Sequence, residues 1–355
     1  MRTRPLRAIL LAFALASSTL TITANTVSAT PNTVSEITDG VARALSAELL
    51  DPSVRANLVQ LAPVTAVDTA RLDIRGRLVG TIDRADTDLL TVKGLPAGSA
   101  RLLQARLGTQ AMADELRHGA TPLVAATPSD DNATDFTAYE PGGKAVKLST
   151  ASVPIQPVVF VDVDVKTATR LGMAVIDNAT HKSRRTPDAV TAGGYWATQI
   201  TSIRFGDVEE PWFKGDAEIF AIVGGFDLNG DVRADTVDMP YLDDENHTYY
   251  PNQLVVHWNR YKYNAADIVF MEDDGDTNYL QLAQALVAAL AYIADLGAYA
   301  PLVDAILQAM PASWWTDDPD FVDACYTVTR EANWTRNCAR GNGTLSVRPF
   351  WVSEL

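Results

Sequence analysis

The chain has 355 residues and a formal net charge of −15 at pH 7, because 44 acidic side chains outnumber 29 basic ones. Nucleic acids and anionic membrane surfaces bind proteins through basic faces, so we expect neither as a direct partner. The length is enough for one large hydrophobic core or for two domains.

Residues 1–29 have the pattern of a secretory signal peptide. Three arginines lie within the first seven positions, residues 6–16 are apolar apart from Arg7, and residues 27–29 provide a small-residue cleavage site. A membrane anchor is the alternative, but the apolar run is short for a bilayer span and Ser and Thr soon interrupt it. We therefore expect a secreted, extracellular protein without an integral membrane segment, whose mature chain begins near Thr30.

The chain contains two cysteines, Cys325 and Cys338. In an oxidising compartment they would close a loop of fourteen residues, counted inclusively, and so stabilise the fold by roughly 3 kcal/mol. A structural zinc site is the alternative, but two cysteines need histidine partners and the nearest one, His257, is distant in sequence. The sequence therefore predicts a disulfide.

The first part of the mature chain reads as a helical and mixed region over residues 30–120. Apolar residues recur at spacings of three and four over residues 33–61, which predicts helix. Further along, alternation over residues 72–75 suggests a strand, and residues 100–116 fit an amphipathic helix.

Residues 121–355 read as a second domain built around strands. Residues 157–165 are rich in β-branched side chains, which predicts a strand. Gly, Pro, Asn and Asp separate the further strands expected, and we see no helix-length segment between them, which favours an antiparallel β-sandwich. These further strands are expected at residues 196–205, 218–226, 254–261 and 267–271.

After residue 276 the apolar period becomes helical again. Residues 279–296 are apolar almost all round, which fits a buried helix better than a short membrane span containing two Gln. A second helix is expected at residues 301–310, and a disulfide-tied strand pair in the tail. The predicted fold class is α+β, with a central antiparallel β-sandwich, a helical N-terminal region and C-terminal helices.

The most distinctive segment is residues 207–276, which contains seventeen Asp or Glu against four Lys or Arg. Carboxylates at this density repel one another unless they are solvated, spread over a surface or neutralised by a cation. Calcium accepts six to eight oxygen ligands in loose geometry, so we expect calcium to be the cofactor if any metal is bound.

One candidate calcium loop covers residues 227–238, with oxygen side chains at positions 1, 3, 5, 9 and 12. Val232 stands where the sharp turn normally requires Gly, and Asp at position 12 reaches less far than Glu. A solvated acidic hairpin turn is the alternative. The candidate ligands of this loop are Asp227, Asn229, Asp231, Asp235 and Asp238.

A second candidate site draws on several loops. In a sandwich, loops at one end of the sheets come together, so the acidic run at residues 272–276 could meet acidic residues from residues 207–216. Capping of the following helix by Asp276 or Thr277 is the competing account of this run. The candidate ligands of the multi-loop site are Asp207, Glu210, Asp216, Asp273 and Asp274.

The sequence carries no strong catalytic motif: it lacks both His-Glu-x-x-His and Gly-x-Ser-x-Gly. Paired carboxylates acting on a polysaccharide or a peptide remain an alternative. The carboxylates considered for acid–base work are Glu210, Asp243, Asp267, Glu272 and Asp274. Several aromatic side chains fit a core or a strand rim better than a sugar-stacking platform. They are Trp212, Trp258, Tyr249, Tyr250, Tyr261 and Tyr263.

Several motifs resemble those of a secreted bacterial family that is known only as a domain of unknown function. The motifs are EPWFKGDAEIF at residues 210–220, MPYLD at 239–243, YPNQ at 250–253, EDDGDTNY at 272–279 and DFVD at 320–323. The resemblance runs from about residue 123 to the C-terminus. It implies export and a common fold, but no activity, and it favours carboxylates within these motifs over those of residues 227–238.

The function expected from the sequence is a calcium-binding, non-catalytic surface module that meets an extracellular ligand or protein partner. A secreted hydrolase that uses paired carboxylates is the alternative. A third interpretation is an acidic structural protein with no specific ligand.

Overall fold

Residues 32–355 form one compact unit in the computed structural model. The signal peptide predicted over residues 1–29 lies outside the residues that the structure describes. These are residues 33–58, 67–69, 72, 77–130, 132–181, 193–208, 211–215, 217–273, 275–296 and 321–353.

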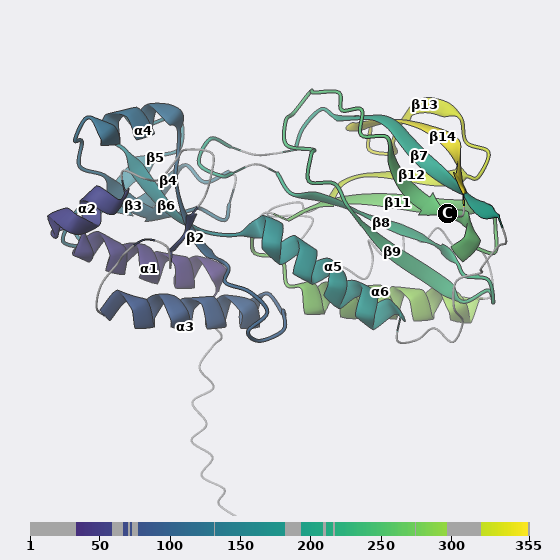
Figure 1. The fold of residues 1–355 in the computed structure, drawn as a ribbon, viewed down its shortest axis with the longest axis horizontal. Helices are drawn as coiled ribbons and strands as arrows, with labels where there is room; N and C mark the ends of the chain where they lie inside the picture. Colours follow the sequence, from purple (N-terminus) through teal and green to yellow (C-terminus); the bar gives the residue numbers. More distant parts are fainter. Residues whose placement is uncertain are drawn as a thin grey trace, which may run out of the picture. The chain divides into compact units, whose positions relative to one another are not determined.

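The described residues form six α-helices and three sheets, one mixed and two antiparallel, which confirms the α+β class (Figure 1). The mixed sheet has the strand order β1-β2-β6-β3-β4-β5, in which β3 and β6 run parallel. Its strands are β1 (Val67–Asp68), β2 (Leu103–Leu107), β3 (Leu123–Ala126), β4 (Asp135–Tyr139), β5 (Ala145–Ser149) and β6 (Val158–Val163).

Four helices accompany the mixed sheet: α1 (Val34–Glu48), α2 (Pro52–Leu58), α3 (Arg77–Val92) and α4 (Gln110–Arg117). Helix α1 begins with a capping box, in which the Thr33 side chain accepts the Glu36 N–H and the Glu36 carboxylate accepts the Thr33 N–H. Its buried face, which includes Val41 and Leu45, packs with β3 and α3 in one core.

The prediction for residues 30–120 was partly wrong. Residues 33–58 are helical as expected, but residues 100–116 are not one helix, because residues 103–107 form β2. Strand β2 is hydrogen-bonded to β1 on one side and β6 on the other, and this pairing outweighs the helical pattern. The mixed sheet also combines strands from both sides of the boundary predicted between residues 120 and 121.

The two antiparallel sheets have the strand orders β10-β7-β14-β13 and β12-β11-β8-β9. We call them the β7–β14 sheet and the β8–β11 sheet. One hydrophobic cluster includes side chains from both, such as Phe205 and Phe270, whose ring centroids are 5.2 Å apart. The strands are β7 (Gly194–Phe205), β8 (Ile219–Phe226), β9 (Val232–Asp238), β10 (Gln253–His257), β11 (Ala265–Glu272), β12 (Phe321–Thr329), β13 (Trp334–Asn337) and β14 (Gly343–Ser353).

A helix that the sequence analysis missed, α5 (Val165–His181), lies between β6 and β7. The expectation that no helix-length segment intervenes among these strands is therefore wrong. β-Branched residues continue past the strand, but the Asp164 carboxylate accepts the Thr167 N–H at 2.9 Å and its hydroxyl at 2.8 Å, which starts the helix. Helix α5 packs against α6 (Tyr279–Leu296) and β9.

Helix α6 confirms the helix predicted at residues 279–296, and its cap is Asn278, whose side chain accepts the Gln281 N–H. Over the ranges described here, no helix combines the length and apolarity needed to cross a bilayer. The helix predicted at residues 301–310 lies outside the described residues.

The predicted disulfide joins Cys325 and Cys338, whose Cα atoms are 4.6 Å apart. Cys325 belongs to β12, and Cys338 directly follows β13, so the bond ties one antiparallel sheet to the other. A disulfide is consistent with an extracytoplasmic location.

Candidate functional site

Asp273, a predicted metal ligand, lies in a buried ion pair with Lys93. The Lys93 ammonium is 3.4 Å from the Asp273 carboxylate and donates a hydrogen bond of 2.8 Å to the Gly275 carbonyl. Neither charged side chain is exposed to solvent. Lys93 directly follows α3 and Asp273 directly follows β11, so this contact connects segments 180 residues apart.

Two hydroxyl groups complete the network around Asp273. The Tyr279 hydroxyl donates to the Asp273 carboxylate, and the Thr169 hydroxyl donates to it at 3.2 Å. Gly172 of α5 leaves room for the tyrosine, because a Cβ at that position would lie 2.0 Å from the Tyr279 ring. The network therefore holds α5 and α6 to the end of α3.

Breaking this ion pair should destabilise the fold strongly, because a single substitution leaves an uncompensated buried charge. We expect Asp273→Ala or Lys93→Met to lower the free energy of unfolding by about 3–5 kcal/mol in urea titrations. Lys144→Met is the control, because its ion pair with Glu140 is exposed and should contribute about 1 kcal/mol or less. If Asp273→Ala lowered the free energy of unfolding by no more than the control does, the proposed role of the buried ion pair would be contradicted.

The predicted calcium loop forms the turn between β8 and β9. The buried Asp227 carboxylate accepts the N–H groups of Asn229 and Asp231 at 2.9 and 3.0 Å. Gly230 takes a φ of +93°, which glycine adopts without a steric penalty. Asp227 thus stabilises the turn through its own backbone.

Two further carboxylates of residues 227–238, those of Asp235 and Asp238, lie on β9. Asp235 accepts hydrogen bonds from the Arg233 guanidinium at 2.7 Å and from the Tyr261 hydroxyl at 2.9 Å. Asp238 ends the strand beside Arg170 and Lys166, and burial raises its pKa. Among the described side chains, no group of three or more His, Cys, Asp or Glu residues is arranged to hold a metal ion.

Glu218, a carboxylate of the EPWFKGDAEIF motif that was in neither the candidate ligand set nor the acid–base set, lies in a cluster of charges between α5 and the β8–β11 sheet. Its carboxylate is 3.3 Å from the Lys166 ammonium, and Asp238 and Asp243 are close enough to repel it. Burial is the main cause that raises the pKa of Glu218 to about 7, and the two carboxylates add to it while Lys166 opposes it. The position of Glu218 in the EPWFKGDAEIF motif is a signal in the sequence, whereas the burial that raises its pKa depends on the fold.

Because its pKa in the folded protein is above the value of about 4.5 in the unfolded chain, Glu218 makes folding less favourable as the pH rises through this range. The loss reaches about 3 kcal/mol above pH 7. We expect Glu218→Gln to reduce this loss, so that the variant gains stability relative to the wild type between pH 5 and 8. If the free energy of unfolding of the wild type and of the variant, measured by urea titration, changed with pH in the same way, the raised pKa of Glu218 would be contradicted.

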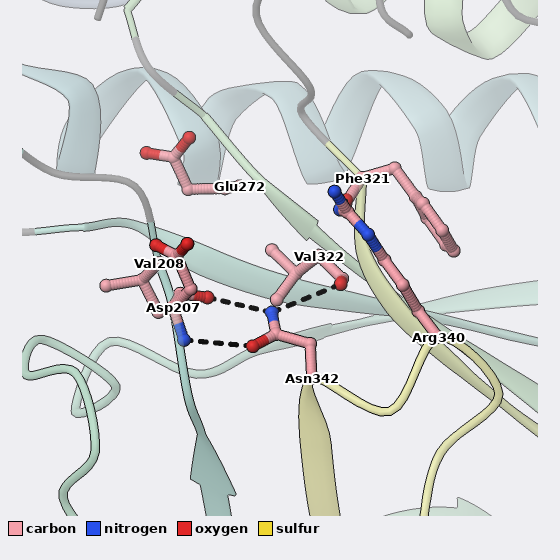
Figure 2. A pocket seen from close by; sticks show the side chains of 7 residues that line it. All are labelled: Asp207, Val208, Glu272, Phe321, Val322, Arg340 and Asn342. Atoms are coloured by element: carbon pink, nitrogen blue, oxygen red, sulfur yellow. Dashed lines mark hydrogen bonds between the residues drawn. The ribbon is translucent and has the colours of Figure 1, made fainter.

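A pocket lies where strand ends and loops from both antiparallel sheets meet. Figure 2 shows the Asp207 and Glu272 carboxylates on one side and the Arg340 guanidinium on the other. Arg340 donates a hydrogen bond of 2.8 Å to the Phe321 carbonyl, which places its positive charge at the start of β12. The lining residues are Asp207, Val208, Glu272, Phe321, Val322, Arg340 and Asn342.

Two side chains that sequence analysis missed build this pocket. The Asn342 amide accepts the Asp207 N–H at 2.9 Å and donates to the Asp207 carbonyl at 2.8 Å, as Figure 2 shows. The fully buried Asp323 carboxylate accepts the N–H groups of Arg340 and Gly343, each at 2.7 Å. Asp323 lies in the DFVD motif, so this motif fixes the loop that carries Arg340.

The structure brings together Asp207 of the multi-loop metal site and Glu272 of the acid–base set. Asp273 points instead to Lys93, and Asp267 accepts the N–H of Thr327 at 2.7 Å. Glu210, Asp216 and Asp274 lie outside the described residues.

Of the six aromatic residues considered for sugar stacking, two are buried in the core, two are partly buried against a core and two are exposed. Trp258 and Tyr261 are buried, and the Trp258 indole N–H donates to the Thr198 hydroxyl at 2.9 Å. Trp212 is partly buried and donates to the Thr150 carbonyl. Tyr250 and Tyr263 are exposed.

Comparison with known proteins identifies one relationship. A family model described as a protein of unknown function, DUF3103, matches residues 34–354, which includes every motif of the predicted resemblance and also the helical N-terminal region. No curated protein and no solved structure matches the chain.

Proposed function

The chain belongs to the DUF3103 family, and we propose that it is a secreted binding module that holds Ca²⁺ in the pocket lined by Asp207 and Glu272. One observation carries this proposal. Two carboxylates from separate segments of the acidic stretch line the same pocket, and Glu272 belongs to a motif that resembles the family.

The charges around the pocket support a cation. Two carboxylates and one guanidinium line the pocket, so the charges of these three side chains sum to −1. Calcium suits such a place because it accepts carboxylate and backbone carbonyl oxygens in loose geometry, and extracellular modules need only about 10⁻⁴–10⁻³ M affinity.

Residues 227–238 form contacts of their own that work against a calcium site there. The Asp227 carboxylate already accepts backbone N–H groups, and Asp235 accepts hydrogen bonds from Arg233 and Tyr261. Calcium would have to compete with these contacts for the same oxygens.

Calcium binding should raise the melting temperature of the mature protein. With 10 mM Ca²⁺ in place of EDTA, the expected affinity corresponds to about 1–3 kcal/mol, a shift of a few degrees. Asp207→Asn and Glu272→Gln should abolish the shift. Asp114→Asn, which removes a distant exposed carboxylate on α4, is the control and should keep it.

The outcome separates calcium from general charge effects. An equal shift with Mg²⁺ would argue for screening of the acidic surface, because Mg²⁺ demands a stricter octahedral geometry than Ca²⁺. No shift in the wild-type protein, or an unchanged shift in both pocket variants, would contradict the proposal.

A second candidate function, hydrolysis of a polysaccharide or peptide, is supported by Glu218. A carboxyl group with a pKa of about 7 is suited to donate a proton near neutral pH, and Asp243 is the nearby carboxylate of the predicted acid–base set.

If Glu218 is a general acid, its protonated form is active, so turnover should fall as the pH rises above about 7. Glu218→Gln should lower kcat by about 100-fold or more in assays over glycans and peptides. If the folded wild-type protein cleaved none of these substrates, the hydrolase proposal would be contradicted, whereas the calcium-binding proposal would be unaffected.

We also infer that the two antiparallel sheets face each other as the predicted β-sandwich. Support comes from their shared hydrophobic cluster, from the contact between Phe205 and Phe270, and from the disulfide that joins them.

A further inference from the structure

The two antiparallel sheets differ in charge although they contain the same number of strand residues. The 32 strand residues of the β7–β14 sheet include three arginines and no Asp or Glu. The 32 strand residues of the β8–β11 sheet include five carboxylates and one arginine. In a chain of net charge −15, the β7–β14 sheet is therefore an exceptional region without acidic side chains.

The strand register shows which side chains of this sheet face away from the core. Leu345 and Val347 are buried in the core shared by the two sheets, so their neighbours along β14 lie on the other face, which we call the outer face. The register places partners on β7 opposite them. The outer face thus carries Thr344, Ser346, Arg348 and Phe350 of β14, opposite Arg204, Ser202, Gln199 and Ala197 of β7. Tyr195, two residues before Ala197, lies on the same face and is paired with Val352.

Hydroxyl and amide groups fill the middle of the outer face. The Ser346 hydroxyl is hydrogen-bonded to Ser202 at 2.8 Å and to Thr335 of β13 at 2.7 Å. Thr344 donates to the Asn337 side chain at 3.0 Å. These groups form a flat polar ladder across three strands.

Arginines stand on both sides of this ladder, and in the described structure neither forms an ion pair. The Arg348 guanidinium donates to the Gln199 side chain at 2.7 Å, and the Arg204 guanidinium donates to the Asn246 carbonyl at 3.1 Å. Both partners are neutral, so each guanidinium keeps an uncompensated positive charge at the surface.

Aromatic side chains lie at one end of the outer face. The Phe350 side chain is 37% exposed. The Tyr195 hydroxyl is 2.9 Å from a ring nitrogen of His257, a residue of β10, the strand that pairs with β7. Their rings offer apolar surface beside the polar ladder and Arg348.

We propose that the outer face of the β7–β14 sheet binds an acidic polysaccharide. Guanidinium groups pair with carboxylates through two parallel hydrogen bonds. The hydroxyl and amide groups of the ladder can form hydrogen bonds with sugar hydroxyls, and the aromatic rings can pack against the apolar face of a sugar ring. This site is independent of the calcium pocket, which is lined by other residues.

The overall negative charge does not prevent this binding. At physiological salt, exposed charges more than about 8 Å apart are largely screened, so a polyanion responds mainly to the face that it touches. Local complementarity at Arg204 and Arg348 therefore decides the contact.

The test is binding of the mature protein to soluble polygalacturonate, measured by affinity electrophoresis, with dextran as the neutral polymer. We expect binding to polygalacturonate and not to dextran, and weaker binding as salt increases. The double variant R204Q/R348Q should bind about tenfold more weakly or not at all, because it loses two charge-assisted contacts. The double variant R117Q/R330Q has the same net charge and should bind as the wild type does.

A second comparison distinguishes sugar recognition from attraction to any polyanion. Phe350→Ser should weaken binding to polygalacturonate and leave any binding to poly-L-glutamate unchanged. The proposal is overturned if polygalacturonate does not bind, if R204Q/R348Q binds as tightly as R117Q/R330Q, or if poly-L-glutamate binds as well as the polysaccharide does.

Discussion

The buried ion pair between Lys93 and Asp273 is the contact on which the arrangement of the described chain depends. Lys93 directly follows α3 and Asp273 directly follows β11, and the hydrophobic cluster that contains Leu89 of α3 also contains Val269 of β11. Desolvation of two charges is costly unless hydrogen bonds satisfy them, and here the Gly275 carbonyl and two hydroxyl groups do so. Only one relative placement of these segments provides all of these partners.

Hydrogen bonds accepted by carboxylates also account for several acidic residues elsewhere in the chain. Asp227, Asp267 and Asp323 each accept backbone N–H groups and so define a turn or a loop. These three carboxylates lie in or beside the β8–β11 sheet, whereas the β7–β14 sheet has no carboxylate among its strand residues. This asymmetry is the reason why we propose a cation for the pocket and an anionic ligand for the outer face.

Local patterns were enough to predict strands β6, β7, β8, β10 and β11, helix α6 and the disulfide, because periodicity and cysteine spacing are encoded within short segments. Strand β9 was missed, because residues 227–238 were interpreted as a calcium loop or a hairpin turn. Helix α5 was missed because its first turn is rich in Val and Thr, and only the Asp164 cap reveals where it begins. Strand β2 was missed because its pairing partners lie far away in sequence. Nothing local marks Lys93 as the partner of Asp273 or gives Glu218 its raised pKa, since both depend on burial by distant segments. Asp207 and Glu272 were both singled out as candidates, but their meeting with Arg340 required the fold.

Native-state hydrogen exchange measures the coupling between these segments most directly. With increasing urea, the amides of Leu89 in α3 and of Val269 in β11 should converge on the same free energy of opening, because the ion pair makes both segments unfold together. In Asp273→Ala, the amide of Leu89 should exchange at a lower free energy than that of Val269. If the two amides already open at different free energies in the wild-type protein, the ion pair does not hold the structure together as described.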